Sequence, residues 1–393
     1  MQHITAILIS LLLGLASCTP PDSEGFDLQV HLQMPPETAG IIPEGATVSL
    51  VNTMNGTTYT VQADAGGYAR FHADYGIYRL TTQFYAYVKD MEYIFNGGME
   101  NIRLTPENSN AAGGITLTLA GSRRSRILIK EVYYAGCYDP NGKTYAKDTY
   151  VSLYNNSDST LWLDSLCIGL VGPTVASKIS PWLTHTPGLL PVMYMGWQFP
   201  GRGKDHPLLP GETVTIAVNA VNHTGAEYNH PNSVNLSKAG WAFYHPSLTG
   251  TDIAAGVTPL YLFNKYTNII FYIFSNLGSG VILYRIPGIS AEAYAADPAN
   301  FRREPNSSVN TDYLIIPASW VVDCVDCVED ATKQGFKRFP ASLDAEPAYL
   351  PSGRYSGRAL RRKIAGNDNG RILYQDTNNS FNDFEETIPE MKP

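Results

Sequence analysis

Phe26-Asp27-Leu28-Gln29-Val30-His31-Leu32 alternates apolar and polar side chains from one residue to the next. A period of two is typical of a half-buried β-strand, because successive side chains point to opposite faces of the sheet. The alternation returns at 45–51 and 68–71, and Asn55-Gly56 and Asp64-Ala65-Gly66-Gly67 supply turn residues between the runs. The sequence therefore predicts a small β-sandwich of short strands joined by tight turns.

A second set of strands is predicted beyond a polar joint at 121–126. The expected strands cover residues 127–133, 148–155, 161–168, 213–217 and, as a buried apolar run, 269–274. The 25 tyrosines, 34 glycines and 26 prolines favour β-structure with many turns, and segments with a helical period are scarce. The predicted fold class is mostly β.

The N-terminal strands resemble a known module. The order of residues 45–51, then Gly67-Tyr68-Ala69, then Gly76-Ile77-Tyr78 resembles transthyretin-like or carboxypeptidase-regulatory-like domains. This resemblance implies a transthyretin-like β-sandwich over residues 25–120, which in such proteins is usually a non-catalytic spacer.

The second set resembles the lamin-tail domain, an immunoglobulin-like sandwich. Glu131-Val132, Tyr150 to Asn155, Leu163-Asp164-Ser165-Leu166 and Leu209-Pro210-Gly211 match the pattern of that domain, with Ser152 and Ser165 where glutamate and glycine are usual. The resemblance implies a larger Ig-like β-sandwich over residues 126–393, with a long insertion at about 172–260.

Taken whole, the chain resembles the Bacteroidales lipoproteins of domain of unknown function family 4876 (DUF4876). The stretches that carry this resemblance are 219–223, 231–239, 361–363 and 376–384. Members commonly accompany TonB-dependent outer-membrane receptors, so the resemblance implies an accessory protein. It implies no enzymatic activity.

The N-terminus predicts export and a lipid anchor. An apolar run from Ile4 to Leu15 is too short for a membrane span and ends at Leu15-Ala16-Ser17-Cys18, which resembles a lipobox. We expect a signal peptide over 1–17, lipidation of Cys18 and a tether over 18–24. Thr19 after the cysteine favours the outer membrane, with exposure at the cell surface as one alternative.

Two kinds of side chain could bind a metal ion or haem, although no cofactor is expected. His206, His223 and His230 lie in the long insertion, but without the spacing of a metal motif. Asp376 and Asp383 lie in a stretch rich in oxygen ligands that departs from an EF-hand, and turns or caps are the favoured interpretation. The arginines at 361 and 362 are expected on a solvated strand face.

Aromatic residues in the insertion are candidates for ligand binding, above all Tyr194, Trp197 and Trp241. Large aromatic rings bind ligands by apolar stacking when they are exposed, although most of them lie in the core.

The cysteines after Cys18 are expected to be structural. We expect thiols or disulfides, because the count is even and an exported chain meets an oxidising compartment. A metal site and a redox Cys-x-x-Cys are the alternatives. The four residues are Cys137, Cys167, Cys324 and Cys327.

The expected function is non-enzymatic. The net charge of −8 argues against nucleic acid as a partner, and no nucleophile elbow, phosphate loop or catalytic residue is found. We expect an outer-membrane lipoprotein that binds a ligand or assists a TonB-dependent receptor. An exported metal-dependent hydrolase with its site at 177–260 and a structural adhesin are the alternatives.

Overall fold

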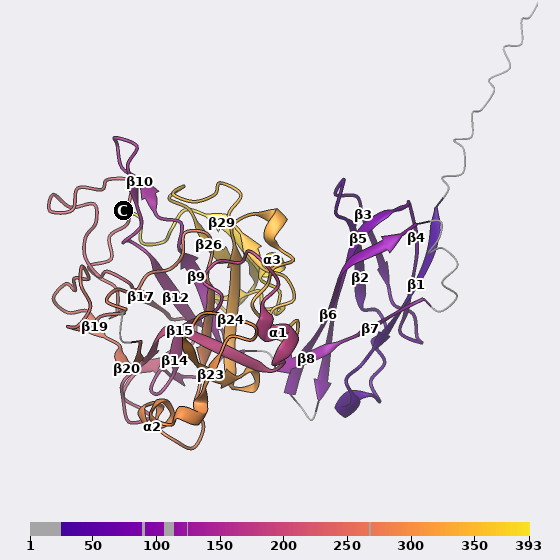
Figure 1. The fold of residues 1–393 in the computed structure, drawn as a ribbon, viewed down its shortest axis with the longest axis horizontal. Helices are drawn as coiled ribbons and strands as arrows, with labels where there is room; N and C mark the ends of the chain where they lie inside the picture. Colours follow the sequence, from indigo (N-terminus) through magenta and orange to yellow (C-terminus); the bar gives the residue numbers. More distant parts are fainter. Residues whose placement is uncertain (1–24, 89–90, 106–113, 124, 267–268) are drawn as a thin grey trace, which may run out of the picture.

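The computed structural model describes residues 25–88, 91–105, 114–123, 125–266 and 269–393. Its strands lie in two groups, one at each end of the long axis (Figure 1). Among the described residues the two groups share no strand. The predicted mostly β class is confirmed, and the described ranges contain three short α-helices. The transthyretin-like, Ig-like and domain-boundary details stay predictions.

The first group contains two sheets that pack around one apolar core. The smaller sheet has the order β4 (Tyr68–Ala73), β1 (Phe26–Gln33) and β7 (Ile115–Thr118). The larger has the order β3 (Thr58–Gln62), β2 (Thr47–Asn52), β5 (Gly76–Val88), β6 (Met91–Leu104) and β8 (Ala120–Arg123). In β1 burial alternates with each residue, so Leu28, Val30 and Leu32 enter the core as the sequence period predicts.

The second group is built on two large sheets. The seven-stranded sheet has the order β19 (Thr258–Pro259), β18 (Trp241–Ala242), β17 (Thr213–Ala217), β12 (Tyr150–Asn155), β9 (Ile127–Tyr133), β26 (Ala359–Arg362) and β29 (Phe384–Thr387). The eight-stranded sheet has the order β22 (Phe301–Arg303), β23 (Asp312–Pro317), β15 (Leu189–Gln198), β14 (Cys167–Val171), β21 (Gly280–Tyr284), β24 (Val321–Val328) and β25 (Ala348–Tyr349), with β20 (Tyr261–Lys265) on β15.

Smaller elements decorate these sheets. The short strand pairs are β10 (Cys137–Tyr138) with β11 (Thr144–Tyr145), β13 (Leu161–Trp162) with β16 (Pro207–Leu208), and β27 (Ile364–Asp368) with β28 (Arg371–Tyr374). The α-helices are α1 (Pro181–His185), α2 (Ala291–Ala296) and α3 (Ser380–Asp383), and 3-10 turns cover Pro36–Thr38, Pro298–Asn300, Ala318–Trp320 and Ala331–Lys333. Among the described residues, none of the helices has the length and apolar character needed to cross a membrane.

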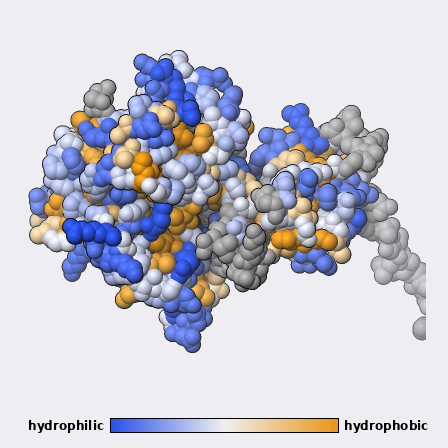
Figure 2. All heavy atoms as spheres, turned by 90° about the horizontal axis from the view of Figure 1, so that it is seen from below, coloured by the Kyte–Doolittle hydropathy of each residue, from blue (hydrophilic) through white to orange (hydrophobic). Residues whose placement is uncertain are grey.

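The central strands of the two large sheets are buried on both faces. Ile129 and Leu153 from one sheet and Leu170 and Leu283 from the other share the main core, so the sheets pack face to face. Other buried clusters cover the outer faces, which is why every residue of β9 and of β12 is buried. The outer surface carries small hydrophobic clusters among hydrophilic residues (Figure 2).

Two predicted strands differ from the structure. The strand expected at 161–168 is divided into β13 and β14 by a turn in which Ser165 has a φ of 60°. The left-handed region favours glycine, which is the residue usual at this position of the lamin-tail pattern. The strand expected at 269–274 is absent: the segment is irregular, and Phe271 points outward with 57% of its surface exposed.

The two groups of strands touch through polar contacts. Arg79 of β5 forms an ion pair with Glu346 at 2.8 Å, and the Gln83 amide donates to the carbonyl of Thr377 at 2.8 Å. Asn96 of β6 donates to the same carbonyl at 3.0 Å. These contacts join the first group to the loops before β25 and α3.

Candidate functional site

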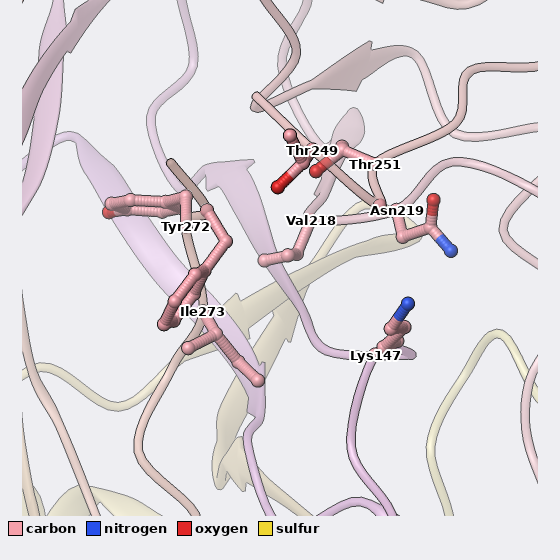
Figure 3. A pocket seen from close by; sticks show the side chains of 9 residues that line it. Lys147, Val218, Asn219, Thr249, Thr251, Tyr272 and Ile273 are labelled. Atoms are coloured by element: carbon pink, nitrogen blue, oxygen red, sulfur yellow. The ribbon is translucent and has the colours of Figure 1, made fainter. Parts of the chain in front are cut away.

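A pocket with a volume of about 310 Å³ opens between the predicted insertion and the segments that flank it (Figure 3). Its walls come from Lys147, Val218 and Asn219, from the loop at 249–251, and from the irregular segment at 271–273. The volume lies at the lower end of the range of about 300–1,000 Å³ typical of small-molecule sites. The pocket therefore has room for a small organic molecule.

Asn219 places an unpaired, buried hydrogen-bond donor at the wall of this pocket. The residue is 2% exposed, and its Oδ1 accepts the backbone N–H of Asp252 at 2.6 Å. Because an N–H can donate only to the oxygen, this contact fixes the amide orientation and leaves Nδ2 as the other terminal atom. Nδ2 is buried without a partner in the described part of the chain and points towards Lys147 in Figure 3.

A buried histidine holds the backbone of Asn219. The Nε2 of His223 lies 2.9 Å from the Asn219 carbonyl, which can only accept, so Nε2 carries the proton. Nδ1 therefore accepts the hydroxyl of Tyr145 at 2.7 Å. Burial lowers the pKa of His223 to about 4, and repulsion from His230 and Lys147 adds to the effect. The imidazole is consequently neutral at pH 7.

Lys147 supplies the positive charge of the pocket. Its ammonium lies near Gly250, where an added Cβ would come within 3.2 Å of Nζ. Gly250 has a φ of 67°, so glycine suits both the backbone and the close approach. In the described part of the chain, no carboxylate forms an ion pair with Lys147. The charge therefore remains available to a ligand.

The opposite wall of the pocket is apolar. Phe271 and Ile273 come from the irregular segment, while Val218 continues the chain from β17. Between them, Tyr272 packs its ring into the core, 4.8 Å from Phe243 and 5.7 Å from Trp197 between ring centroids. The rigid core thus anchors the segment that lines the pocket.

The candidate metal ligands lie in three separate places. His223 and His230 both contact Tyr145, and the ring of His230 stacks on it at 3.6 Å between centroids. His206 packs against Trp241 at 4.9 Å, and Asp376 and Asp383 lie elsewhere, around Arg362. Within the described ranges, no group of three or more His, Cys, Asp or Glu residues could hold a metal ion.

The carboxylates of Asp376 and Asp383 form part of a closed ionic cluster. Arg362 is 2% exposed and pairs with Asp323 at 2.9 Å, Asp383 at 3.1 Å and Asp376 at 3.3 Å. Burial raises the pKa of Asp323 to about 7 against the opposing pull of Arg362, and it also raises the pKa of Asp383. The expectation of a solvated face is wrong for Arg362, because these carboxylates enclose it.

The sequence favoured a turn or a strand-end cap at 376–384, and in the structure this stretch contains a helix cap. The side chain of Asn379 accepts the backbone N–H of Asn382 and caps α3. The Asp383 carboxylate accepts both the backbone N–H and the hydroxyl of Thr377, at 2.8 and 2.6 Å. The oxygens proposed for a cation therefore already have partners within the fold.

The three candidate stacking residues lie in or beside the core. Trp197 is fully buried and Trp241 is 6% exposed, so neither ring presents a face to a ligand in this structure. Tyr194 is half-buried, has a φ of 61°, and exchanges a hydrogen bond with Thr174. Trp197 lies behind the pocket through Tyr272 rather than in its wall.

The four cysteines of the described chain are buried free thiols: Cys137, Cys167, Cys324 and Cys327. Cys324 and Cys327 lie three residues apart on β24, and residues at odd spacing on a strand point to opposite faces. The two side chains accordingly enter different cores. Burial raises the pKa of both thiols well above the ordinary value. Cys18, the predicted lipidation site, lies outside the described residues.

A larger groove of about 1,050 Å³ lies near the joint between the two groups of strands. Half-buried Trp162 and Trp320 and the side chain of Arg285 line it. The Arg285 guanidinium already donates to the carbonyls of Asp164 and Trp162 at 2.7 and 2.6 Å. The smaller pocket is the stronger candidate site, because its buried donor and its cation are unpaired.

Sequence reasoning missed Lys147 and Asn219 as site residues. Asn219 belongs to the stretch 219–223 that carries the DUF4876 resemblance, which was the only available signal. Lys147 is an exposed residue between β11 and β12, where a lysine is ordinary.

Comparisons with known proteins extend this picture. A family model described as "Protein of unknown function (DUF4876)" matches residues 209–391. The crystal structure of a DUF4876 family protein from Bacteroides thetaiotaomicron is similar, with 25% identity, a TM-score of 0.62, and coverage of 93% of this chain and 96% of that one. No curated protein matches the chain. The resemblance to this family that the sequence predicts is therefore confirmed.

Proposed function

For this chain of the DUF4876 type, we propose a non-enzymatic role as a ligand-binding lipoprotein of the outer membrane that assists a TonB-dependent uptake system. The observation that carries the binding role is the unpaired, buried Nδ2 of Asn219 beside the unpaired Lys147 in an apolar pocket. A buried donor without a partner costs about 1–3 kcal/mol, which a bound ligand can recover. The pocket is thus incomplete without an acceptor.

The membrane location rests on the N-terminal sequence. The apolar run ending at Cys18 supports export and lipidation, and several acyl chains on one cysteine would give stable anchoring. The contacts of β5 and β6 with the loops at 334, 346 and 377 support a role of the first group of strands as a spacer that holds the pocket-bearing group at a defined angle.

Fractionation and affinity isolation test this function. The full chain expressed in its own host should fractionate with the outer membrane, and pull-down after mild solubilisation should recover an outer-membrane β-barrel. A Cys18→Ser variant should lose lipid labelling and enter the soluble fraction. Recovery of the wild-type protein without any barrel would overturn the uptake role, and an unlabelled wild-type chain would overturn the anchor.

The alternative functions predict other results. A metal-dependent hydrolase would carry a stoichiometric metal by elemental analysis and would lose it when His206, His223 and His230 are replaced together. An adhesin would bind a surface or a second cell without any dependence on the pocket residues Lys147 and Asn219.

A further inference from the structure

The chemistry of the pocket restricts its ligand more narrowly than the proposed function does. The polar side chains that line it without partners are the Asn219 amide NH₂ and the Lys147 ammonium, which only donate, and the Thr251 hydroxyl, which can donate or accept. Lysine cannot accept a hydrogen bond, and the contact of Asn219 Oδ1 with the Asp252 N–H leaves only the amide NH₂ for the pocket. A ligand group that accepts hydrogen bonds and carries negative charge matches the amide and the ammonium, and the Thr251 hydroxyl can donate to it as well.

The number and type of donors favour a single carboxylate over a phosphate. The described lining residues contain one cation and no arginine, whose fork is the usual partner of phosphate oxygens. One ammonium balances one negative charge, and the ammonium and the amide can each reach one oxygen of a carboxylate.

The remaining lining residues indicate the size and polarity of the rest of the ligand. Val218, Phe271 and Ile273 offer apolar surface, and the volume of about 310 Å³ admits a compact molecule. Lys147 and Asn219 lie together on one side of the cavity, whereas Tyr272 and Ile273 lie on the other (Figure 3). A ligand with a charged head and an apolar body would fit these two sides.

We propose that the pocket binds a small monocarboxylate with an apolar body, its carboxylate held by Lys147 and by Asn219 Nδ2. This inference rests on the proposed ligand-binding function and names the ligand class of the same pocket. His223 and Tyr145 act as positioning residues: His223 donates to the carbonyl of Asn219, Tyr145 donates to His223, and neither lines the cavity.

Calorimetric titration of the folded chain with benzoate, hexanoate, benzamide and hexanamide tests the proposal. Both carboxylates should bind, and each amide should bind at least about tenfold more weakly, since hydrogen bonds to charged groups contribute about 1.5–3 kcal/mol. Inorganic phosphate should not compete with the carboxylates. Equal binding of acids and amides, or failure of both acids to bind, would overturn the carboxylate assignment.

Two variants locate the binding. Asn219→Asp keeps the acceptor for the Asp252 N–H but replaces the donor by a negative charge, so carboxylate binding should fall at least about tenfold. Lys147→Met should weaken it about fivefold and reduce the preference for acids over amides, because the exposed ammonium is screened by water. Lys178→Met, a change at another exposed lysine, is the matched control and should leave binding unchanged.

The variants also remain informative when one misfolds. Lys147 is exposed and far less coupled to the fold than Asn219, so Lys147→Met tests the charge even if Asn219→Asp is unstable. Undiminished binding to Lys147→Met would contradict the proposal. Binding of the amides with the same affinity as the acids would leave the ligand-binding function intact and refute only the ligand class, whereas the fractionation and pull-down tests address the function itself.

Discussion

Two buried polar networks in the second group of strands differ in one respect. The network around Arg362 is closed, because its guanidinium pairs with Asp323, Asp376 and Asp383 and also donates to two backbone carbonyls. The network around His223 is open: its hydrogen bonds run from Tyr145 through His223 to the backbone carbonyl of Asn219, and the side-chain amide donor of Asn219 has no partner and lines a pocket. Both networks lie in the same β-scaffold.

The difference separates a structural role from a binding role. A closed network uses its groups to hold strands together: Asp323 of β24 receives the backbone N–H of Ile129 on the other large sheet at 2.5 Å. In an open network, one polar atom has no partner in the fold and can hydrogen-bond to a ligand. The fold lacks the stabilisation that this hydrogen bond would give. A buried polar residue therefore indicates a site only when one of its atoms lacks a partner and faces a cavity.

The largest effect should follow loss of the closed network's cation. Arg362→Met leaves three buried carboxylates without their partner and should lower the free energy of unfolding by about 3–5 kcal/mol, the cost typical of breaking a buried ion pair. Urea unfolding of both proteins at pH 7 measures the change.

An exposed ion pair supplies the control for this variant. Arg303 pairs with Asp312 at 3.2 Å, and about half of each side chain is exposed. Arg303→Met should change stability by about 1 kcal/mol or less. If the two variants are equally stable, the closed cluster does not hold the strands together and the comparison fails.

The open network should respond to pH through His223. Its pKa is about 4 in the folded chain and 6.5 ordinarily, so below pH 6.5 the unfolded chain binds a proton that the folded chain does not. The contribution to stability is complete above pH 6.5 and is lost as pH falls to 4, by up to about 3 kcal/mol. His223→Gln, which stays neutral, should not lose it.

The difference between the two unfolding curves isolates this contribution. Carboxyls with a raised pKa, such as Asp323 and Asp148, act with the opposite sign, since the folded chain holds their protons as the unfolded chain releases them. Their effects are common to both proteins and cancel in the difference. A difference that stays constant between pH 4 and 7 would show that His223 binds its proton equally well in the folded and unfolded chains, so that folding does not lower its pKa.

The sequence predicts the positions of the strands better than it predicts which buried polar side chains pair with one another. Strands 127–133 and 213–217 were predicted with the bounds that the structure gives them, because local apolar patterns define them. The pairing of Arg362 with Asp323, Asp376 and Asp383 joins residues up to 60 positions apart, and local patterns carry no such information. The segment at 269–274 was misread because its apolar residues serve both the core and the pocket wall.

A smaller effect on the free energy of unfolding is expected for a residue of the pocket that serves binding and not the fold. Lys147 is exposed and unpaired in the described chain, so Lys147→Met should change the free energy of unfolding by about 0.5 kcal/mol or less. The same variant should weaken ligand binding, as argued above. A loss of stability much larger than this would assign Lys147 to the fold and make the two networks alike.

The smallest effect concerns the thiols that adjoin the two networks. Cys324 and Cys327 belong to β24, an eight-residue strand between β21 and β25, whereas Cys137 lies in a two-residue strand and contacts Asp148 at 3.7 Å. All four thiols should resist iodoacetamide in the folded Cys18→Ser chain, because each is buried and its pKa is raised.

Over long exposure, Cys137 should react before Cys324 and Cys327, since short strands open locally more often than longer strands that are paired on both sides. Mass spectrometry of the modified peptides gives the order. Earlier modification of Cys324 would mean that the closed network opens more readily than the region around the pocket, and a mass loss reversed by reductant would mean that a disulfide replaces two of the thiols.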